Sequence, residues 1–422
     1  MDILRIEGRV RLCGAVRING SKNSSLPIMA AAILTAGKSI LKSVPHLSDI
    51  SVFGELLGQL GCKVSENANG DLCIDSTVID NPVGGYEIVR RMRASICILG
   101  ALLARCGRAE VSMPGGCAIG DRPVDIHLRG LRELGAQIHL ENGYIVAEAP
   151  QGLTGKDIFL GGPFGSTVLG TANVLMAATV AKGKTIIESA ACEPEITDLA
   201  NCLNKMGAKI TGIGSPRLII EGVKELQPAE FEVIPDRIEA GTFMVAAAIT
   251  AGELKISNCR LDDMMAVVDR LRNIGVTVDA AKDGCVVARN GPIKPTDITT
   301  QPYPGFPTDL QAQFMALLSL GQGNSVVIEK VFPDRFMHVA ELNRMAANLR
   351  KEGPAVIIAG VEKLIAAPVM ASDLRASAAL VLAGLAAEGT TVVNRVYHID
   401  RGYEKIEEKL NPVGAKITRE SI

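Results

Sequence analysis

Six residues that could bind or activate a small anion recur at similar positions along the chain. Each lies 14 to 16 residues before a glycine that closes an alanine-rich stretch, and four of the six are cations. They are Lys22, Arg93, Thr167, Arg237, Asp309 and Arg375. At a helix N-terminus the partial positive charge disfavours a cation by about 0.3–1 kcal/mol. Helix N-termini combined with cations suit phosphate or carboxylate, so we expect an anion site.

Two plainer interpretations of these residues stay open. Neighbouring acids could neutralise the cations, as Asp236 and Glu239 could for Arg237. Asp309 could be a simple helix N-cap. An acid among substrate-binding cations is also what a general base would look like, and we therefore keep Asp309 as a candidate base.

A loop is predicted at residues 113–123, which contain three glycines and two prolines. Cys117 lies there among small residues, five positions before Arg122, and nearby positive charge lowers the pKa of a thiol from about 8.5. We expect Cys117 to be reactive and the other nine cysteines to be small buried hydrophobic side chains. Arg122 and Arg401 each lie 13 residues before a second recurring glycine, and Arg335 begins a longer copy of that element.

The elements that must position these residues form a sixfold repeat of roughly 70 residues. An apolar helix ends near a glycine that we expect at positive φ, and a β-branched strand follows. A more charged helix ends near a second glycine, and another strand follows. The first helix type is apolar all round and predicted to be buried, whereas the second is amphipathic and half exposed. The first glycines are Gly37, Gly107, Gly183, Gly252, Gly323 and Gly389. The second are Gly61, Gly135, Gly207, Gly275, Gly353 (in the looser copy LRKEGPAVII) and Gly414.

Length and composition limit the possible functions. A chain of 422 residues suits two domains, and the polar segment 225–230 between the third and fourth repeats predicts their boundary. The net charge of −2, the 3% aromatic content and the absence of Trp indicate neither nucleic acid nor an anionic membrane as partner. The N-terminus does not resemble a signal peptide, and ten cysteines without CxxC pairs argue against structural zinc. We expect a cytoplasmic protein with reduced thiols.

Eight motifs, in order along the whole chain, resemble the UDP-N-acetylglucosamine 1-carboxyvinyltransferase family of enolpyruvyl transferases. The related shikimate-pathway enolpyruvyl transferases share the repeats but lack the cysteine loop and the RPVD run. The motifs are GSKNSSLP (20–27), MRASICILG (92–100), PGGCAIGDRPVDIH (114–127), PDRIEAGTF (235–243), FPTDLQAQF (306–314), RFMHVAEL (335–342), SDLRASAALVLAG (372–384) and YHIDRGYE (397–404).

The resemblance implies a fold and a reaction. The fold would be a two-domain inside-out α/β barrel of six βαβαββ repeats, three per domain, with buried inner helices. Residues 21–230 would form one domain, and residues 1–20 would join 231–422 in the other, the two closing over substrate. The reaction would transfer enolpyruvyl from phosphoenolpyruvate to the 3′-hydroxyl of UDP-N-acetylglucosamine, the first committed step of peptidoglycan synthesis. It needs no metal, no organic cofactor and no obligate protein partner.

The resemblance also assigns roles to residues of this chain. Cys117 would be the acid and could add covalently to phosphoenolpyruvate, and Asp309 would accept the hydroxyl proton. Lys22, Arg122 and Arg401 would hold phosphoenolpyruvate, supported by Arg335 and Arg375. The sugar nucleotide and its surroundings would be contacted by Asn23, Arg93, Arg122, Pro123, Val124, Asp125, His127, Thr167, Val168, Asp309, Val331 and Asp373.

One segment departs from the family pattern. The family usually has Ser-Val-Gly-Ala-Thr where this chain has Thr-Val-Leu-Gly-Thr at 167–171, so Leu169 would add bulk near the nucleotide. An enolpyruvyl transferase acting on another nucleotide is therefore an open alternative. A second alternative is a catalytically silent protein that binds sugar nucleotide, against which Cys117, Asp309 and Lys22 argue by their presence.

Overall fold

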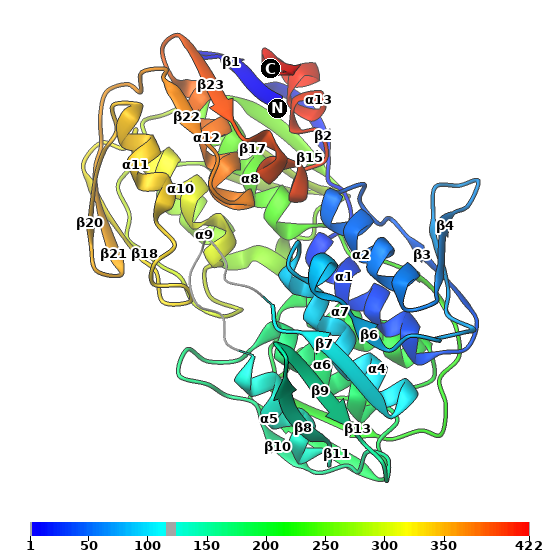
Figure 1. Ribbon diagram of the computed structural model, residues 1–422. Coiled ribbons are helices and arrows are strands. Elements are labelled where there is room, and N and C mark those ends of the chain that lie inside the picture. Colours follow the sequence, from blue (N-terminus) through cyan, green and yellow to red (C-terminus); the bar gives the residue numbers. More distant parts are fainter. Residues whose placement is uncertain (1, 115–123, 422) are drawn as a thin grey trace. The chain divides into compact units, whose positions relative to one another are not determined.

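The computed structural model describes residues 2–114 and 124–421, which form two compact domains (Figure 1). The first domain comprises residues 20–114 and 124–234, and the second comprises 2–19 and 235–421. The chain thus passes between the domains after residues 19 and 234, compared with residues 20 and 230 expected from the sequence. Each domain has its own hydrophobic core.

Six four-stranded sheets account for the strands of the described residues, three in each domain. In each sheet a parallel pair of strands is extended by two antiparallel strands. In five sheets these two strands form a hairpin, such as β20–β21 beside β18–β19, and in the sixth they are β1 and β24 from the two ends of the chain. In sheet order, the first domain contains β14 (Glu230–Glu232), β3 (Lys38–Lys42), β5 (Leu72–Asp75) and β4 (Lys63–Glu66); β6 (Val83–Gly84), β7 (Arg108–Ser112), β9 (Tyr144–Glu148) and β8 (Gln137–Glu141); and β10 (Asp157–Phe159), β11 (Lys184–Glu188), β13 (Arg217–Glu221) and β12 (Lys209–Thr211). The second domain contains β2 (Cys13–Arg17), β15 (Glu253–Ser257), β17 (Gly284–Ala288) and β16 (Thr277–Ala281); β18 (Ile298–Thr299), β19 (Asn324–Ile328), β21 (Ala355–Ala359) and β20 (Asn348–Glu352); and β22 (Pro368–Met370), β23 (Thr390–Asn394), β1 (Asp2–Glu7) and β24 (Ile417–Ser421).

Three strands complete sheets that are distant from them in sequence. At the N-terminus, β1 lies antiparallel between β23 and β24, and β2 runs parallel to β15. After the third repeat, β14 runs parallel to β3, with Phe231 opposite Leu41. The last strand of the first domain in sequence, β14, therefore completes the sheet that contains its first strand, β3.

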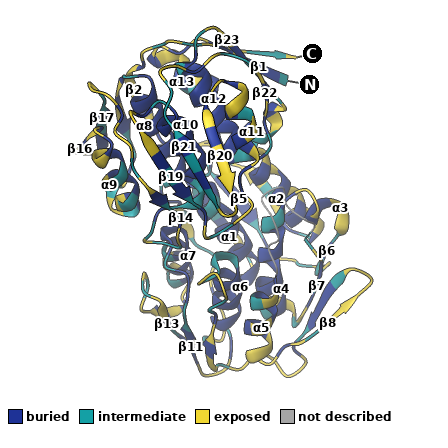
Figure 2. Cartoon of the chain, turned by 90° about the vertical axis from the view of Figure 1, so that its left-hand side faces the viewer, coloured by how far each residue is buried: buried dark blue, intermediate teal, exposed yellow. Residues whose placement is uncertain are grey.

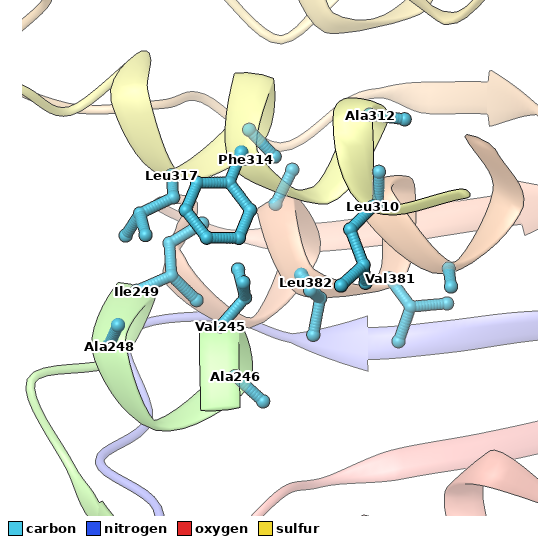
Figure 3. Packing of buried hydrophobic residues seen from close by; sticks show 14 of the residues in the cluster. Val245, Ala246, Ala248, Ile249, Leu310, Ala312, Phe314, Leu317, Val381 and Leu382 are labelled. Carbon is cyan, nitrogen blue, oxygen red and sulfur yellow. The ribbon is translucent and has the colours of Figure 1, made fainter. Parts of the chain in front are cut away.

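Six inner helices are buried almost all round, as their apolar sequences predict (Figure 2). Within each domain the three inner helices contact one another. Figure 3 shows Val245 and Ile249 of α8 beside Leu310, Phe314 and Leu382 in the second domain. Side chains cap four of the six: Ser21, Thr167, Asp236 and Asp373 accept from first-turn amides. The inner helices are α1 (Lys22–Ala31), α4 (Ile98–Cys106), α6 (Val168–Ala178), α8 (Arg237–Ile249), α10 (Gln311–Leu318) and α12 (Leu374–Ala386).

The second helix of each repeat is amphipathic. In α5, His127, Leu128 and Leu131 face the core, whereas Arg129 and Arg132 are exposed. The expected inside-out α/β barrel of six βαβαββ repeats, with buried inner helices, is confirmed. The outer helices are α2 (Ser48–Gln59), α5 (Asp125–Glu133), α7 (Pro194–Lys205), α9 (Met265–Asn273), α11 (Met337–Arg344) and α13 (Ile406–Leu410); the short helices are α3 (Tyr86–Val89), η1 (Ala32–Leu34), η2 (Arg93–Cys97), η3 (Leu261–Met264), η4 (Thr308–Leu310), η5 (Val396–Arg401) and η6 (Asn411–Val413).

Two of the twelve repeat glycines do not have the expected role. Gly252 does not have positive φ; Ala251 takes φ +48° instead, and a Cβ on Gly252 would lie 2.2 Å from the carbonyl oxygen of Leu12. Close approach to the incoming N-terminal segment, rather than a left-handed turn, requires glycine there. Gly353 lies in the turn between β20 and β21, so the segment LRKEGPAVII is a hairpin and not the end of a helix.

Ala346 occupies the position that the fifth repeat was expected to give to Gly353. In three repeats an asparagine side chain both accepts from the amide and donates to the carbonyl of the residue six positions later. The pairs are Asn204 with Ile210, Asn343 with Leu349, and Asn411 with Ile417. Gly207 and Gly414 lie three residues after their asparagines, and Ala346 does so after Asn343, with φ +64°. Alanine therefore adopts the left-handed conformation here, which a search for glycine misses.

The expectation that nine cysteines are buried holds for six of them. Cys13 and Cys106 are exposed and Cys192 is intermediate. Cys13 begins the mostly exposed strand β2, and Cys106 is the last residue of α4. The ends of elements reach solvent even where the element itself is buried. Among the described residues, no helix is long and apolar enough to cross a membrane.

Candidate functional site

The six residues predicted at helix N-termini all lie there. Lys22 begins α1, Arg93 begins η2 ahead of α4, and Thr167 caps α6. Arg237 begins α8, Asp309 lies in η4 ahead of α10, and Arg375 is the second residue of α12. The repeat thus brings one candidate side chain to the start of each inner helix.

Lys22 forms a buried ion pair in the first domain. Its Nζ lies 3.0 Å from Oδ2 of Asp49, and the two side chains are 7% and 5% exposed. Asp49 is in the first turn of α2, where a carboxylate is favoured by the helix dipole. Sequence reasoning missed Asp49, because nothing in the sequence marks an acid 27 residues away as the partner of a lysine. The pair holds the ammonium group at the start of α1.

Asp198 of α7 fixes the same end of α1. The hydroxyl of Ser24 donates to Oδ2 of Asp198, and the amide of Ile234 donates to the same oxygen at 3.2 Å. Asn23, between Lys22 and Ser24, is half-buried. The first turn of α1 is therefore tied to both outer helices that contact it.

Asn173 of α6 connects three helices that carry candidate sugar-nucleotide residues. Its side-chain amide donates to the carbonyl of Ile96 at 3.0 Å, and its oxygen accepts from the amide of Gly100 at 2.7 Å. Its nitrogen also lies 3.0 Å from Nδ1 of His127. Arg93 is half-buried and begins η2, which contains Ile96, so Asn173 connects the buried His127 to the helix that carries Arg93. Val124 and Asp125, which precede His127, are buried and exposed respectively.

The segment 167–171 forms the N-terminus of α6. Thr167 accepts from the amide of Gly170 at 3.3 Å, and Thr171 accepts from the amide of Ala191 at 3.0 Å. Val168 and Leu169 are half-buried and pack against the core of the first domain. Part of the Leu169 side chain therefore packs against that core.

A cluster of acids and arginines lies at the starts of η4 and α12 in the second domain. Nη1 of Arg335 donates to Oδ1 of Asp309 at 2.7 Å, and its Nη2 lies 3.7 Å from Asp373. Nε of Arg375 lies 3.5 Å from Oδ2 of Asp309. Burial acts to lower the pKa of Arg335, but Asp309 and Asp373 outweigh it and the pKa is raised. Both cations therefore stay charged beside a carboxylate that is still 26% exposed.

Arg375 is the most unusual member of this cluster. Its side chain is 1% exposed, and its guanidinium carbon lies 5.3 Å from the centre of the Tyr403 ring. Burial disfavours its charge, but Tyr403 and Asp309 outweigh burial and the pKa is raised. Within the described residues, none of its three side-chain nitrogens has a well-directed hydrogen bond. A buried cation with unused donors is suited to receive an anion.

Arg401 ends η5 next to this cluster and is half-buried. A Cβ on the following residue, Gly402, would lie 2.6 Å from Cδ1 of Leu374 and 3.4 Å from Nη1 of Arg375. The chain thus approaches Arg375 as closely as it does only because residue 402 is glycine. This approach brings Arg401 to the start of α12.

Arg237 differs from the other helix-starting cations. It lies over the ring of Tyr303, 5.6 Å from the ring centre. Asp236 caps α8 through the amides of Ile238 and Glu239, and Glu239 pairs with Lys409 at 2.7 Å. A cation–π contact therefore holds the guanidinium of Arg237 against Tyr303.

Val331 follows β19 and is half-buried, and its amide donates to the carboxylate of Glu329 at 2.8 Å. Glu329 is a second residue that sequence reasoning missed. Cys117, Arg122 and Pro123 lie outside the described residues, so their expected roles stay predictions. Among the described residues, no three His, Cys, Asp or Glu side chains group as they would to hold a metal ion.

Comparison with known proteins shows the family to which the chain belongs. The family model described as EPSP synthase (3-phosphoshikimate 1-carboxyvinyltransferase) matches residues 6–410. The UDP-N-acetylglucosamine 1-carboxyvinyltransferase of Methylacidiphilum infernorum is 53% identical over 419 residues, covering 99% of each chain. The protein of the same name from Gluconobacter oxydans is 53% identical over 423 residues, covering 100% of each.

Two solved structures share the fold. The enolpyruvyl transferase NikO from Streptomyces tendae superposes with a TM-score of 0.89 at 26% identity, covering 100% of this chain and 99% of that one. An EPSP synthase from Acinetobacter baumannii superposes with a TM-score of 0.76 at 18% identity, covering 100% of both chains. The second likeness concerns the fold alone.

Proposed function

The chain belongs to the enolpyruvyl transferase family that the EPSP synthase model describes, and from this premise we propose that it transfers enolpyruvyl from phosphoenolpyruvate to the 3′-hydroxyl of UDP-N-acetylglucosamine. Phosphate is the second product. The reaction commits a sugar nucleotide to peptidoglycan synthesis. The relatives that carry this name share more than half of their residues with the chain over nearly its full length.

The observation that carries the proposal is the cluster of Asp309, Arg335 and Arg375. Phosphoenolpyruvate has a carboxylate and a phosphate, and Arg375 offers buried donors that have no well-directed hydrogen bond within the described residues. A planar guanidinium binds such groups through paired hydrogen bonds. Asp309 lies directly beside these donors and keeps part of its surface exposed. A base and an anion site are therefore adjacent within one domain.

The residues divide the proton transfers of the reaction among them. An acid must protonate the methylene carbon of phosphoenolpyruvate, which leaves cationic character at C2; we assign this step to Cys117. The acceptor oxygen then bonds to C2 while Asp309 takes its proton. Loss of a proton from the new methyl group and departure of phosphate restore the double bond. The cations Lys22, Arg335, Arg375 and Arg401 offset the negative charge of the substrate during these steps.

The first domain supplies groups suited to the acceptor. Asn173 of α6 contacts His127 and the carbonyl of Ile96, and Arg93 begins η2, the helix that contains Ile96. Helix N-termini and arginine suit a diphosphate. Because Leu169 packs partly into the core, we favour UDP-N-acetylglucosamine over another nucleotide as the acceptor.

The test is phosphate release from phosphoenolpyruvate with UDP-N-acetylglucosamine, with UMP, or with no acceptor. Leu169→Gly is the matched variant for acceptor choice. We expect release only with UDP-N-acetylglucosamine, in the parent and in Leu169→Gly alike. Release only with UMP would assign the chain to another acceptor, and no release with any acceptor would identify a silent binder.

A further inference from the structure

Glu329 follows β19 and is completely buried, yet its carboxylate has four donors. Oε1 accepts from the hydroxyl of Thr300 at 2.6 Å and from the amides of Val331 and Phe332 at 2.8 and 2.9 Å. Oε2 accepts from the hydroxyl of Thr308 at 2.8 Å. A buried carboxylate is costly unless hydrogen-bonded, so this degree of satisfaction stabilises one local geometry.

The fifth repeat differs from four of the other five at this position. In four repeats the residue directly after the second strand has a left-handed conformation, with φ between +54° and +59°. These residues are Ser43, Ser189, Asn258 and Arg395. Neither Met113 nor Glu329, at the same position of the second and fifth repeats, has positive φ. The residues that follow Met113 include Cys117, and those that follow Glu329 include Val331 and Arg335.

In place of the left-handed turn, the Glu329 side chain shapes the chain that follows it. It accepts amides two and three residues onward, at Val331 and Phe332. Its other oxygen accepts from Thr308, the residue before Asp309. Thr308 in turn accepts from Nη1 of Arg335 at 3.1 Å, the atom that also donates to Asp309. One carboxylate therefore ties the Val331 turn to the Asp309 turn.

We propose that Glu329 is a positioning residue for the acceptor hydroxyl, because its carboxylate holds the Val331 turn and the Thr308–Asp309 turn at a fixed separation. This inference rests on the proposed function, in which Val331 contacts the acceptor and Asp309 takes its proton. Glu329 touches neither substrate. It acts through Thr308 and through the backbone of Val331.

The central variant is Glu329→Gln, which keeps the size of the side chain but removes its charge. The amides of Val331 and Phe332 then lose a charge-assisted bond, and the new NH2 group faces the hydroxyl of Thr308. We expect KM for the acceptor to rise about tenfold and kcat to fall about tenfold to a hundredfold, as displacements near 1 Å do. KM for phosphoenolpyruvate should change by less than about twofold.

Thr308 provides the conservative pair. Thr308→Ser keeps the hydroxyl and should retain parental kinetics, whereas Thr308→Val should lower kcat about as much as Glu329→Gln does. The kcat of the double variant Glu329→Gln, Thr308→Val should be no lower than that of either single variant, because both substitutions disrupt the same hydrogen bond between Thr308 and Glu329. Asp297→Asn is the matched control: Asp297 lies directly before β18, is exposed, and accepts from the amide of Val326 in β19 at 2.9 Å.

Hydrogen exchange of the peptide covering 329–336 separates this inference from the proposed function. We expect faster exchange there in Glu329→Gln and not in Asp297→Asn, whether or not the parent accepts UDP-N-acetylglucosamine. An inactive parent with this result would overturn the function and support the tie between the two turns. Unchanged exchange, unchanged kinetics in Glu329→Gln, or an equal rise of KM for both substrates would overturn the positioning role.

Discussion

Arg335 donates from Nη1 to Oδ1 of Asp309 at 2.7 Å, although the two residues are 26 positions apart in the sequence. Asp309 is thus neither a plain helix cap nor an isolated acid. A guanidinium hydrogen-bonded to a carboxylate holds the carboxylate in one orientation, and a general base must be held within reach of the proton that it accepts. The pair therefore suits Asp309 to take a proton from a hydroxyl.

The buried pair of Lys22 and Asp49 predicts a particular pattern of stability. Breaking a buried ion pair by removing one partner typically costs about 3–5 kcal/mol. We expect Lys22→Met to lower the free energy of unfolding of the first domain by this amount, measured by urea denaturation. Lys22→Met combined with Asp49→Leu should recover much of that stability but no activity.

Lys42→Met is the control for this series, because Lys42 and Glu230 form an exposed pair in the same domain. Such pairs contribute about 0–1 kcal/mol. Equal losses in Lys22→Met and Lys42→Met would contradict the assignment of a buried pair.

Ala346 predicts a stabilising substitution. A non-glycine residue in the left-handed region costs about 1–3 kcal/mol, and glycine's greater freedom in the unfolded chain offsets about 0.5–1 kcal/mol of the gain. We expect Ala346→Gly to raise the free energy of unfolding of the second domain by about 1 kcal/mol, measured by urea denaturation. Gly135→Ala should have the opposite sign, because Gly135 has φ +98° and no atom within 4 Å of an added Cβ. A lower free energy of unfolding in Ala346→Gly would contradict the view that alanine is strained at φ +64°.

His338 predicts a pH dependence of stability. It is buried in α11 with Nε2 2.9 Å from Sδ of Met315, and burial lowers its pKa to about 4. The unfolded chain, with a pKa of about 6.5, binds the proton more readily, so stability is lost as pH falls from about 6.5 to about 4. The loss from this residue should reach about 3 kcal/mol. The urea midpoint of His338→Gln should fall less over that window; parallel curves for both proteins would contradict this.

Cys117 predicts sensitivity to an epoxide. Because the loop carries Cys rather than Asp, we expect fosfomycin to inactivate the enzyme in the presence of sugar nucleotide, and Cys117→Asp to resist it. Cys106→Ser is the control. The residue as a whole is exposed, but desolvation of its sulfur raises the pKa of the thiol, so loss of Cys106 should leave the sensitivity intact. Full activity after excess fosfomycin would show that Cys117 is not the reactive thiol.

Periodicity in the sequence predicted the repeats, the buried inner helices and the helix-starting positions of Lys22, Arg93 and Arg375. These features depend on local composition. An apolar stretch of helical length followed by a glycine is enough to predict a buried helix and the residue near which it ends. The sequence did not predict the left-handed turn at Ala346, because that turn does not require glycine. The two hydrogen bonds between the side chain of Asn343 and the backbone of Leu349 accompany the turn with alanine in it. Gly252 was placed correctly but for the wrong physical reason.

The partners of the candidate residues could not be predicted. Asp49 and Glu329 are single acids in ordinary sequence contexts, and only folding brings Asp49 to Lys22 and Glu329 to Thr308. The unused donors of Arg375 are likewise a property of packing, since an arginine in a sequence does not reveal what surrounds it. Residue types suggested the chemistry, and tertiary contacts determine which residues act together.

The most direct test of the account is phosphate release by Asp309→Asn with both phosphoenolpyruvate and UDP-N-acetylglucosamine present. Asparagine keeps the shape of the side chain but cannot accept the proton. We expect kcat to fall about 10²–10⁴-fold relative to the parent, with both KM values changed only a few fold. A parental rate in Asp309→Asn would contradict the role of Asp309 as the base.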